Sequence, residues 1–344
     1  GWTTYERCSS EQIKKFTVFN KYLRPLPWKL VLDLGVGEGQ EQKRNWPVGP
    51  DDFEKLIDGK HFTNGADKDD VKKLFRKMSG AQLGGIRELN FESMKPPSEQ
   101  EARDLGDCLN LCKSLTSLDL QGTGMSDGAC QALFSTLANG SLQSLKTLIL
   151  NDNTIGTGGV RMLADALSRG ALENCEILRL GKNHYIDSDG VIALAGAMNQ
   201  GSLKRCEQLS LDHNRISNDG VRALADAMSR GALGSCQELY LNSNQIDNDG
   251  LRALIDAVGQ GALPDCQLLY LDGNQISEDG VQVFINAISQ GALANCKKFS
   301  LDMNQIGKDG LRALVDAKRR GGLGDCQMLQ DRSRIILAWI ADTI

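Results

Sequence analysis

The most constraining feature of the chain is an internal repeat of about 30 residues, which runs from about residue 83 to residue 325. One unit reads Cys236-Gln-Glu-Leu-Tyr-Leu-Asn-Ser-Asn-Gln-Ile246 and continues into Asn248-Asp-Gly-Leu. Six cysteines mark equivalent positions at steps of 30 residues, with one step of 31: Cys175, Cys206, Cys236, Cys266, Cys296 and Cys326. Self-similarity at this period predicts a solenoid, in which each repeat packs only against its neighbours.

Each repeat divides into a strand and a helix. Leu209 and Leu211 alternate with Ser210 and Asp212, the period of two that is typical of a strand with one buried face. Further along, apolar residues follow the i, i+3, i+4, i+7 spacing of an amphipathic helix: Val221, Leu224, Ala225 and Met228. Stacked units of this kind predict an α/β fold, a curved array with a parallel sheet on the concave side and helices on the convex side.

Three further sets of equivalent positions, here called columns, recur in the repeats. We expect helix N-caps at the aspartates Asp189, Asp219, Asp249, Asp279 and Asp309. We expect left-handed C-caps at Gly140, Gly170, Gly201, Gly231, Gly261, Gly291 and Gly321. An amide column should satisfy backbone groups of the adjacent coil: Asn153, Asn183, Asn214, Asn244, Asn274 and Asn304, with Thr123 and Met94 in the two earlier, more divergent units. Solvated i, i+4 ion pairs are expected on the helices: Arg161/Asp165, Arg222/Asp226, Arg252/Asp256 and Arg312/Asp316.

The pattern Leu-x-Leu-x-x-Asn-x-Ile, with a helix opening at Asp-Gly, resembles the ribonuclease-inhibitor-like class of leucine-rich repeat. That class is found also in NOD-like receptors and in the Ran GTPase-activating protein. The resemblance covers about 240 of the 344 residues. It implies the curved leucine-rich-repeat solenoid, but it implies little about function, since the same fold hosts many functions.

The chain divides into three parts by composition. Residues 1–82 are expected to form an irregular N-terminal capping region, residues 83–330 the leucine-rich repeats, and residues 331–344 an apolar C-terminal cap or docking tail. In the first part, the stretch from Val31 to Gly39 resembles motif I of the S-adenosylmethionine-dependent methyltransferases. Only 49 residues separate Gly39 from Leu89, too few for the rest of a doubly wound domain. A capping strand is therefore favoured, with a cofactor or nucleotide site at Gly35, Gly37 and Gly39 as the alternative.

The composition of the chain argues against several classes of function. With 39 Lys+Arg against 44 Asp+Glu the net charge is -5, which argues against a general nucleic-acid binder. No stretch approaches the roughly 20 apolar residues of a membrane helix. Only three histidines occur, and none of the common catalytic or metal-binding motifs is present. We therefore expect no enzyme activity, no cofactor and no metal.

The ten cysteines also bear on the compartment. Six of them recur at the repeat period and form a ladder of equivalent positions, which indicates buried free thiols, so we expect an intracellular and most simply cytoplasmic protein. Import into an organelle after loss of a targeting segment stays open. Any rapidly reacting thiols should come mainly from outside the ladder, from Cys8, Cys108, Cys112 and Cys130.

The concave strand face is the expected binding surface. Tyr240 and Tyr270 fall on neighbouring strands, and aromatic side chains with a polar tip are common interface anchors. The candidate partner-binding residues are Arg179, Asp212, His213, Glu238, Tyr240, Tyr270, Asp272 and Asp302. They predict a non-catalytic protein-interaction scaffold or subunit of a larger complex, whose protein partner presents a basic surface or segment. The alternative, by fold analogy, is a regulator of a small GTPase.

Overall fold

The computed structural model describes residues 83–320 and 327–329, together with residue 58. Its strands are β1 (Glu88–Asn90), β2 (Ser117–Asp119), β3 (Thr147–Ile149), β4 (Ile177–Arg179), β5 (Gln208–Ser210), β6 (Glu238–Tyr240), β7 (Leu268–Tyr270), β8 (Lys298–Ser300) and β9 (Gln327–Leu329). Its helices are α4 (Glu99–Leu111), α5 (Asp127–Thr136), α6 (Thr157–Ser168), α7 (Ser188–Asn199), α8 (Asn218–Ser229), α9 (Asn248–Gly259), α10 (Glu278–Ser289) and α11 (Lys308–Arg319). The predicted terminal regions 1–82 and 331–344 and the 31–39 glycine motif lie outside the described residues.

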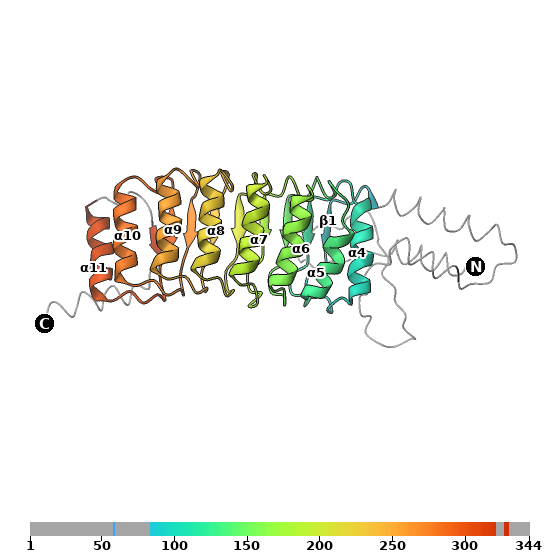
Figure 1. Cartoon of the computed structure of the whole chain (residues 1–344), viewed down its shortest axis with the longest axis horizontal. Coiled ribbons are helices and arrows are strands. Elements are labelled where there is room, and N and C mark those ends of the chain that lie inside the picture. Colours follow the sequence, from blue (N-terminus) through green and yellow to red (C-terminus); the bar gives the residue numbers. More distant parts are fainter. Residues whose placement is uncertain (1–57, 59–82, 321–326, 330–344) are drawn as a thin grey trace, which may run out of the picture.

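The described strands form one parallel sheet whose spatial order follows the chain, from β1 to β9. The helices stand in a row along one side of this sheet (Figure 1). Each strand pairs with the next at a constant repeat offset, so that Leu209 lies opposite Leu239 and Leu239 opposite Leu269. The predicted α/β solenoid, with a parallel sheet on one face and helices on the other, is confirmed.

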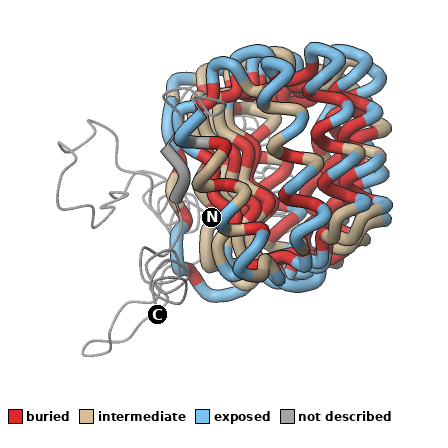
Figure 2. Tube along the Cα trace, turned by 90° about the vertical axis from the view of Figure 1, so that its left-hand side faces the viewer, coloured by how far each residue is buried: buried red, intermediate tan, exposed pale blue. Residues whose placement is uncertain are grey.

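A continuous aliphatic core fills the space between the sheet and the helices. Leu209, Leu211 and the helix residue Leu224 are all fully buried, and the same positions are buried in the coils on either side. Buried stretches recur in register from coil to coil (Figure 2). One repeat, which forms one coil of the solenoid, exposes apolar side chains toward the coils before and after it. These side chains become buried only when the neighbouring coils pack against them.

The asparagine column connects successive coils behind the strands. The Nδ2 group of Asn244 donates to the carbonyl of Leu241 in its own coil, at 3.1 Å, and to that of Leu211 in the preceding coil, at 3.0 Å. Its Oδ1 atom accepts from the Ile216 backbone N–H at 3.0 Å. The same arrangement recurs at Asn153, Asn183, Asn274 and Asn304. The prediction that this column satisfies backbone groups of the adjacent coil is confirmed.

One position of the column is incomplete. In the repeat with the extra residue, His184 and Tyr185 separate Asn183 from Ile186, where the other regular repeats have a single residue. His184 is exposed and takes a left-handed backbone, with φ of 58°. The next asparagine, Asn214, keeps its donor bonds, but its buried Oδ1 atom has no hydrogen-bond partner in the described structure. The inserted residue therefore breaks one bond of the column.

The predicted N-caps are wrong by two residues, whereas the predicted C-cap glycines are mostly right. The N-cap of α7 is Asp187, whose extended backbone lets its side chain accept from the Gly190 N–H at 3.1 Å, while Asp189 lies inside the first turn. An aspartate there is still favoured by the positive end of the helix dipole, which explains the repeated Asp-Gly. Left-handed φ values of 79° to 101° follow the helices at Gly170, Gly201, Gly231, Gly261 and Gly291. Gly140 also has positive φ but follows the α5 C-cap, Leu137, by three residues.

The ion pairs on the helices also differ from the prediction. Arg222 pairs backward with Asp219 at 2.7 Å and across to Asp249 of the next coil at 3.6 Å, rather than with Asp226. Arg161 likewise pairs with Asp189 of the next coil, at 3.2 Å. An acidic residue on the N-terminal side of the arginine is the better orientation, because the helix dipole favours it as well.

The thiols of the described residues are free and buried, including Cys108, Cys112 and Cys130. The expectation that these three would be the accessible thiols is therefore wrong, because they lie on inward-facing parts of α4 and α5 or directly after α4. Burial raises the pKa of the Cys112 thiol to about 12 and that of Cys175 to about 12. Within the ladder, Cys236 Sγ donates to the Glu238 carbonyl at 3.4 Å. Cys8 and Cys326 lie outside the described residues.

Candidate functional site on the concave face

The strand face carries one outward column that changes from coil to coil. Its members pair directly across the sheet: Asp119, Ile149, Arg179, Ser210, Tyr240, Tyr270 and Ser300. Each follows a buried leucine or phenylalanine, so the alternation of the strand turns it outward. The alternation of the strand therefore fixes which positions face outward, but it does not constrain which amino acid occupies each of them.

A second set of residues forms the rim where the strands end. These residues take left-handed φ values of 52° to 64°: Gly122, Asp152, Lys182, His213, Ser243, Gly273 and Met303. His213 belongs to this turn, with its N–H donating to the Asn242 carbonyl at 2.9 Å. Of the predicted site residues, His213 thus lies on the rim rather than on the strands. Among the described residues, Met303 is the most exposed large apolar side chain, at 75 %.

A chain of hydrogen bonds crosses three strands below this rim. Arg179 donates from Nε at 3.2 Å and from Nη2 at 2.9 Å to Gln208 Oε1. Gln208 Nε2 in turn donates to Glu238 Oε2 at 2.8 Å, and that oxygen also accepts from the Tyr240 hydroxyl at 2.8 Å. These bonds hold the guanidinium, the amide and the phenol in fixed orientations.

Tyr240 and Tyr270 form a stacked pair on β6 and β7. Their ring centroids are 5.0 Å apart and their planes differ by 4°. Burial and the hydrogen bond to Glu238 raise the pKa of Tyr240 to about 12, and burial with the charges of Asp272 and Glu238 raises that of Tyr270. Both hydroxyls therefore stay protonated at neutral pH and can act as donors.

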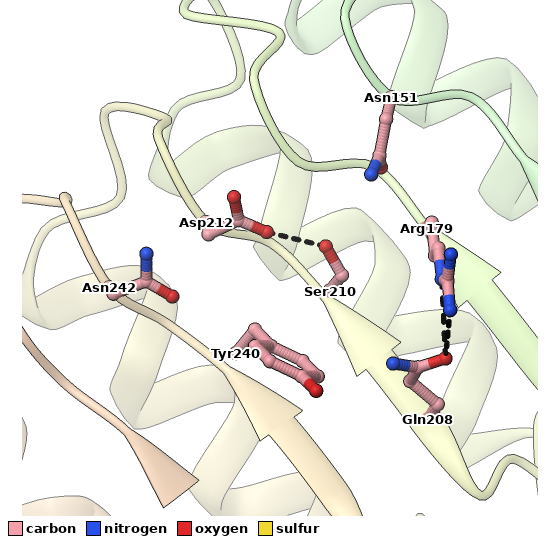
Figure 3. Close-up of a pocket in the computed structure, with 7 residues that line it drawn as sticks. All are labelled: Asn151, Arg179, Gln208, Ser210, Asp212, Tyr240 and Asn242. Atoms are coloured by element: carbon pink, nitrogen blue, oxygen red, sulfur yellow. Dashed lines mark hydrogen bonds between the residues drawn. The ribbon is translucent and has the colours of Figure 1, made fainter. Parts of the chain in front are cut away.

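A hollow of about 280 Å³ opens beside this pair (Figure 3). Its lining residues are Asn151, Arg179, Gln208, Ser210, Asp212, Tyr240 and Asn242. Three of them, Arg179, Asp212 and Tyr240, belong to the predicted site. The other four were missed, although Ser210 stands in the outward column, Asn151 and Asn242 occupy the position of Asp212 in their own repeats, and Gln208 aligns with Glu238. Alignment of equivalent positions across the repeats could have identified all four.

Two of the remaining predicted residues form a separate acidic zone. Asp272 and Asp302 follow β7 and β8 at equivalent positions. Burial, and then the negative charge of Asp302, raise the pKa of Asp272 to about 6, against opposing backbone hydrogen bonds. The predicted residues therefore fall into a polar hollow over β4 to β6 and an acidic zone over β7 and β8.

The described residues contain no group of three or more His, Cys, Asp or Glu side chains that could hold a metal ion. Within the same part of the chain, no helix has both the length and the apolar character needed to cross a membrane. The groups present on the concave face are hydrogen-bonding, aromatic and acidic side chains. Such a surface is suited to binding through stacking, hydrogen bonds and charge.

Comparisons with known proteins agree with the fold. A family model described as a leucine-rich repeat matches residues 111–134, 141–164, 207–225 and 237–254. Together with the parallel solenoid, these matches show that the chain contains leucine-rich repeats, and leucine-rich repeat domains generally bind proteins. No curated protein sequence matches the chain.

Two solved structures share low similarity with the chain. A crystal structure of an internalin (InlF) from Listeria monocytogenes is 16% identical, with a TM-score of 0.27, and the match covers 73% of this chain and 88% of that one. A chain of the octameric complex of Latrophilin 3, Unc5D and FLRT2 is also 16% identical, with a TM-score of 0.39, covering 71% of this chain and 69% of that one. At these values neither structure informs on partners.

Proposed function

We propose that the protein is a non-catalytic protein-binding scaffold, or a subunit of a larger assembly, which holds a partner protein on its concave face. The observation that carries this proposal is the sequence of different polar and aromatic side chains along one column of an otherwise regular sheet. Arg179, Ser210 and Tyr240 occupy equivalent positions on successive strands, yet they differ in size and chemistry. Stacking of the coils does not require such variation, whereas a partner that contacts several coils does.

The partner's chemistry follows from the acidic zone. Burial, and then repulsion by the negative charge of Asp302, raise the pKa of Asp272, and the carboxylate of Glu238 lies beside the tyrosine pair. A cation placed here relieves the repulsion and can also lie against the tyrosine rings. A segment bearing arginine or lysine is therefore the best match for this part of the face.

Selection of peptides from a displayed random library against the full chain tests the proposal. We expect enrichment of basic peptides, whose affinity falls at least tenfold, or about 1.4 kcal/mol, in a variant carrying both Asp272→Asn and Asp302→Asn. Asp256→Asn is the matched control, because Asp256 is an exposed aspartate on α9, on the opposite side of the coils. Peptides that bind the double variant as tightly as wild type would place the partner on another surface.

Three related proposals accompany this function. Helices of 12 residues in each regular repeat support the ribonuclease-inhibitor-like subtype. Free buried thiols in the described coils support an intracellular location, which cell fractionation of the tagged protein tests. Both end coils need a cover for their apolar sides, which supports capping roles for residues 1–82 and 331–344. Truncation of either segment should then lower the unfolding temperature.

A further inference from the structure

The hollow is lined by two planar groups, Arg179 and Tyr240, on the strands on either side of Ser210, and we call the space between them the slot. Ser210 stands in the outward column directly between Arg179 on β4 and Tyr240 on β6. Strands lie about 4.8 Å apart, so the two flanking groups rise from backbones separated by roughly 10 Å. Ser210 itself is short and only 5 % exposed, and it forms the floor of the slot. Figure 3 shows Arg179 and Tyr240 on opposite sides of Ser210.

Both walls are held before any partner arrives. The guanidinium of Arg179 makes two hydrogen bonds to Gln208, and the Tyr240 hydroxyl bonds Glu238 while its ring stacks on Tyr270. A ligand group that enters the slot therefore does not have to order either wall. Pre-organisation of this kind lowers the entropic cost of binding.

One edge of the slot offers a hydrogen-bond acceptor. Asp212 accepts from the Ser210 hydroxyl, and it leans toward Gly181 on the neighbouring coil, where an added Cβ atom would collide with its carboxylate. The absence of a side chain at position 181 thus leaves room for this orientation. Asn151 and Asn242 line the same edge.

A planar ring placed over Ser210 would lie one strand spacing, roughly 5 Å, from the strands that carry Arg179 and Tyr240. That separation falls within the range of aromatic stacking against Tyr240 and of cation–π contact with Arg179. A cationic side chain fits less well, because it would face the like charge of Arg179. An aliphatic side chain would gain neither interaction, so the slot favours an aromatic ring.

We propose that the slot formed by Arg179, Ser210 and Tyr240 accepts one aromatic side chain of the protein partner, a tyrosine or tryptophan, whose O–H or N–H donates to Asp212. This inference rests on the proposed function and adds a second anchor to it. The aromatic side chain occupies the slot, while the basic residue of the same segment occupies the acidic zone two strands away.

The decisive variant fills the slot from within the chain. Ser210→Tyr adds a third ring to the column beside Tyr240, whereas the control Ser300→Tyr adds the same ring beyond Tyr270, outside the hollow. Circular dichroism and thermal unfolding establish that both variants fold. The probes are peptides selected from the displayed library on the full chain, each compared with a version in which its tyrosine or tryptophan is replaced by alanine.

We expect the alanine replacement to weaken binding at least tenfold with wild type and with Ser300→Tyr, and less than twofold with Ser210→Tyr. Arg179→Met, which leaves the slot open but removes the charge, should reduce the preference for the aromatic residue about threefold, equivalent to the lower range of cation–π energies. If Ser210→Tyr does not fold, Arg179→Met becomes the deciding variant. An unchanged preference of Arg179→Met for the aromatic peptide over its alanine version then overturns the inference.

The two proposals can fail separately. If the selected peptides lose affinity on the Asp272/Asp302 double variant but not on Ser210→Tyr, the concave face binds a partner and the aromatic slot is wrong. If both variants bind the peptides as tightly as wild type, the concave site itself is wrong. A library that yields no binder sensitive to Ser210→Tyr also overturns the inference.

Discussion

The two sides of the sheet in this protein follow opposite rules. Behind the strands, the same asparagine and the same cysteine recur in successive coils. The asparagine side chain donates to a carbonyl of the preceding coil, and the cysteine thiol donates to a carbonyl of its own coil. On the concave side, the outward column changes from arginine to serine to tyrosine over successive coils. Repetition therefore marks the positions that make the same buried bond in successive coils, whereas variation marks the positions available to a partner.

The sharpest form of this comparison involves two asparagines of one coil. Asn244 is buried behind β6 and satisfies backbone groups of two coils, while Asn242, two residues earlier, lines the hollow in front. We expect Asn244→Ala to lower the free energy of unfolding by about 3 kcal/mol, because it leaves the Ile216 N–H and the Leu211 carbonyl buried without that partner. Urea unfolding followed by circular dichroism measures this loss.

Asn242→Ala is the matched control, with an expected change within about 0.5 kcal/mol. Equal losses at the two positions would contradict the separation of the two sides. Asn214→Ala refines the test, because the Asn214 Oδ1 atom lacks a partner and only its donor bonds are lost. Its cost should be about 1 kcal/mol below that of Asn244→Ala.

The buried thiols predict the next largest effect, which depends on pH. Burial raises the pKa of Cys236 from 9.0 to about 12, so the folded chain keeps a proton that the unfolded chain releases above pH 9. The stability contributed by this thiol is present below pH 9 and declines by about 1.4 kcal/mol for each pH unit up to about 12. Urea unfolding at pH 7, 9 and 10 should show this decline.

Cys236→Ser sharpens the same comparison. The serine hydroxyl inherits the Glu238 carbonyl as an acceptor, so its cost at pH 7 should be about 1 kcal/mol, at the low end for a buried hydroxyl. Because the variant has no thiol to ionise, its stability relative to wild type should rise by about 1 kcal/mol between pH 9 and pH 10, which cancels the deficit seen at pH 7. A deficit that is independent of pH would show that Cys236 is not buried as described.

The repeating side of the molecule was open to prediction from sequence, since a column of identical residues at a constant period has few structural explanations. The buried leucines, the bonded asparagines and the glycines after most helices follow from it. The helix starts could not be placed as well, because Ser217, Asn218 and Asp219 are all capping residues and only the backbone angles distinguish them. The ion pairs failed for a related reason, since Arg222 has carboxylates on both sides.

The concave site was predictable only as a set of positions. Periodicity showed that Arg179, Ser210 and Tyr240 share a column, but not that Gln208 and Glu238 hold the two planar groups apart over the serine. Those bonds depend on side-chain orientations that no spacing rule provides. The thiols outside the ladder illustrate the same limit, because Cys108 and Cys130 are buried by helix faces rather than by the repeat.

The extra residue near His184 provides a test with a smaller expected effect, in which the change should stabilise the protein rather than destabilise it. Deleting Tyr185 restores the 30-residue period and gives Ile186 the position from which other repeats donate to the asparagine of the next coil. We expect a gain of about 1 kcal/mol in unfolding free energy, reduced by the loss of the contact of Arg215, 5.2 Å from the Tyr185 ring centroid. Replacing Tyr185 by Ala, which keeps the extra residue, is the control and should give no gain. A deletion that destabilises the protein would show that the insertion is a required part of the coil.

The smallest expected effect lies on the helices, where the repeated charges neither connect buried groups nor face the concave side. Arg222 pairs with Asp219 and Asp249, and all three side chains are about half exposed or more. Arg222→Met keeps the aliphatic length and should cost about 0.5 kcal/mol or less, because water screens exposed ion pairs. Unfolding should be measured in low salt and in 1 M salt. The difference between variant and wild type should be smaller in 1 M salt, because the screening length there falls to about 3 Å. A loss comparable to that of Asn244→Ala would mean that the coils are also connected through their outer charges, and the contrast between repeated buried bonds and free surface positions would then no longer hold.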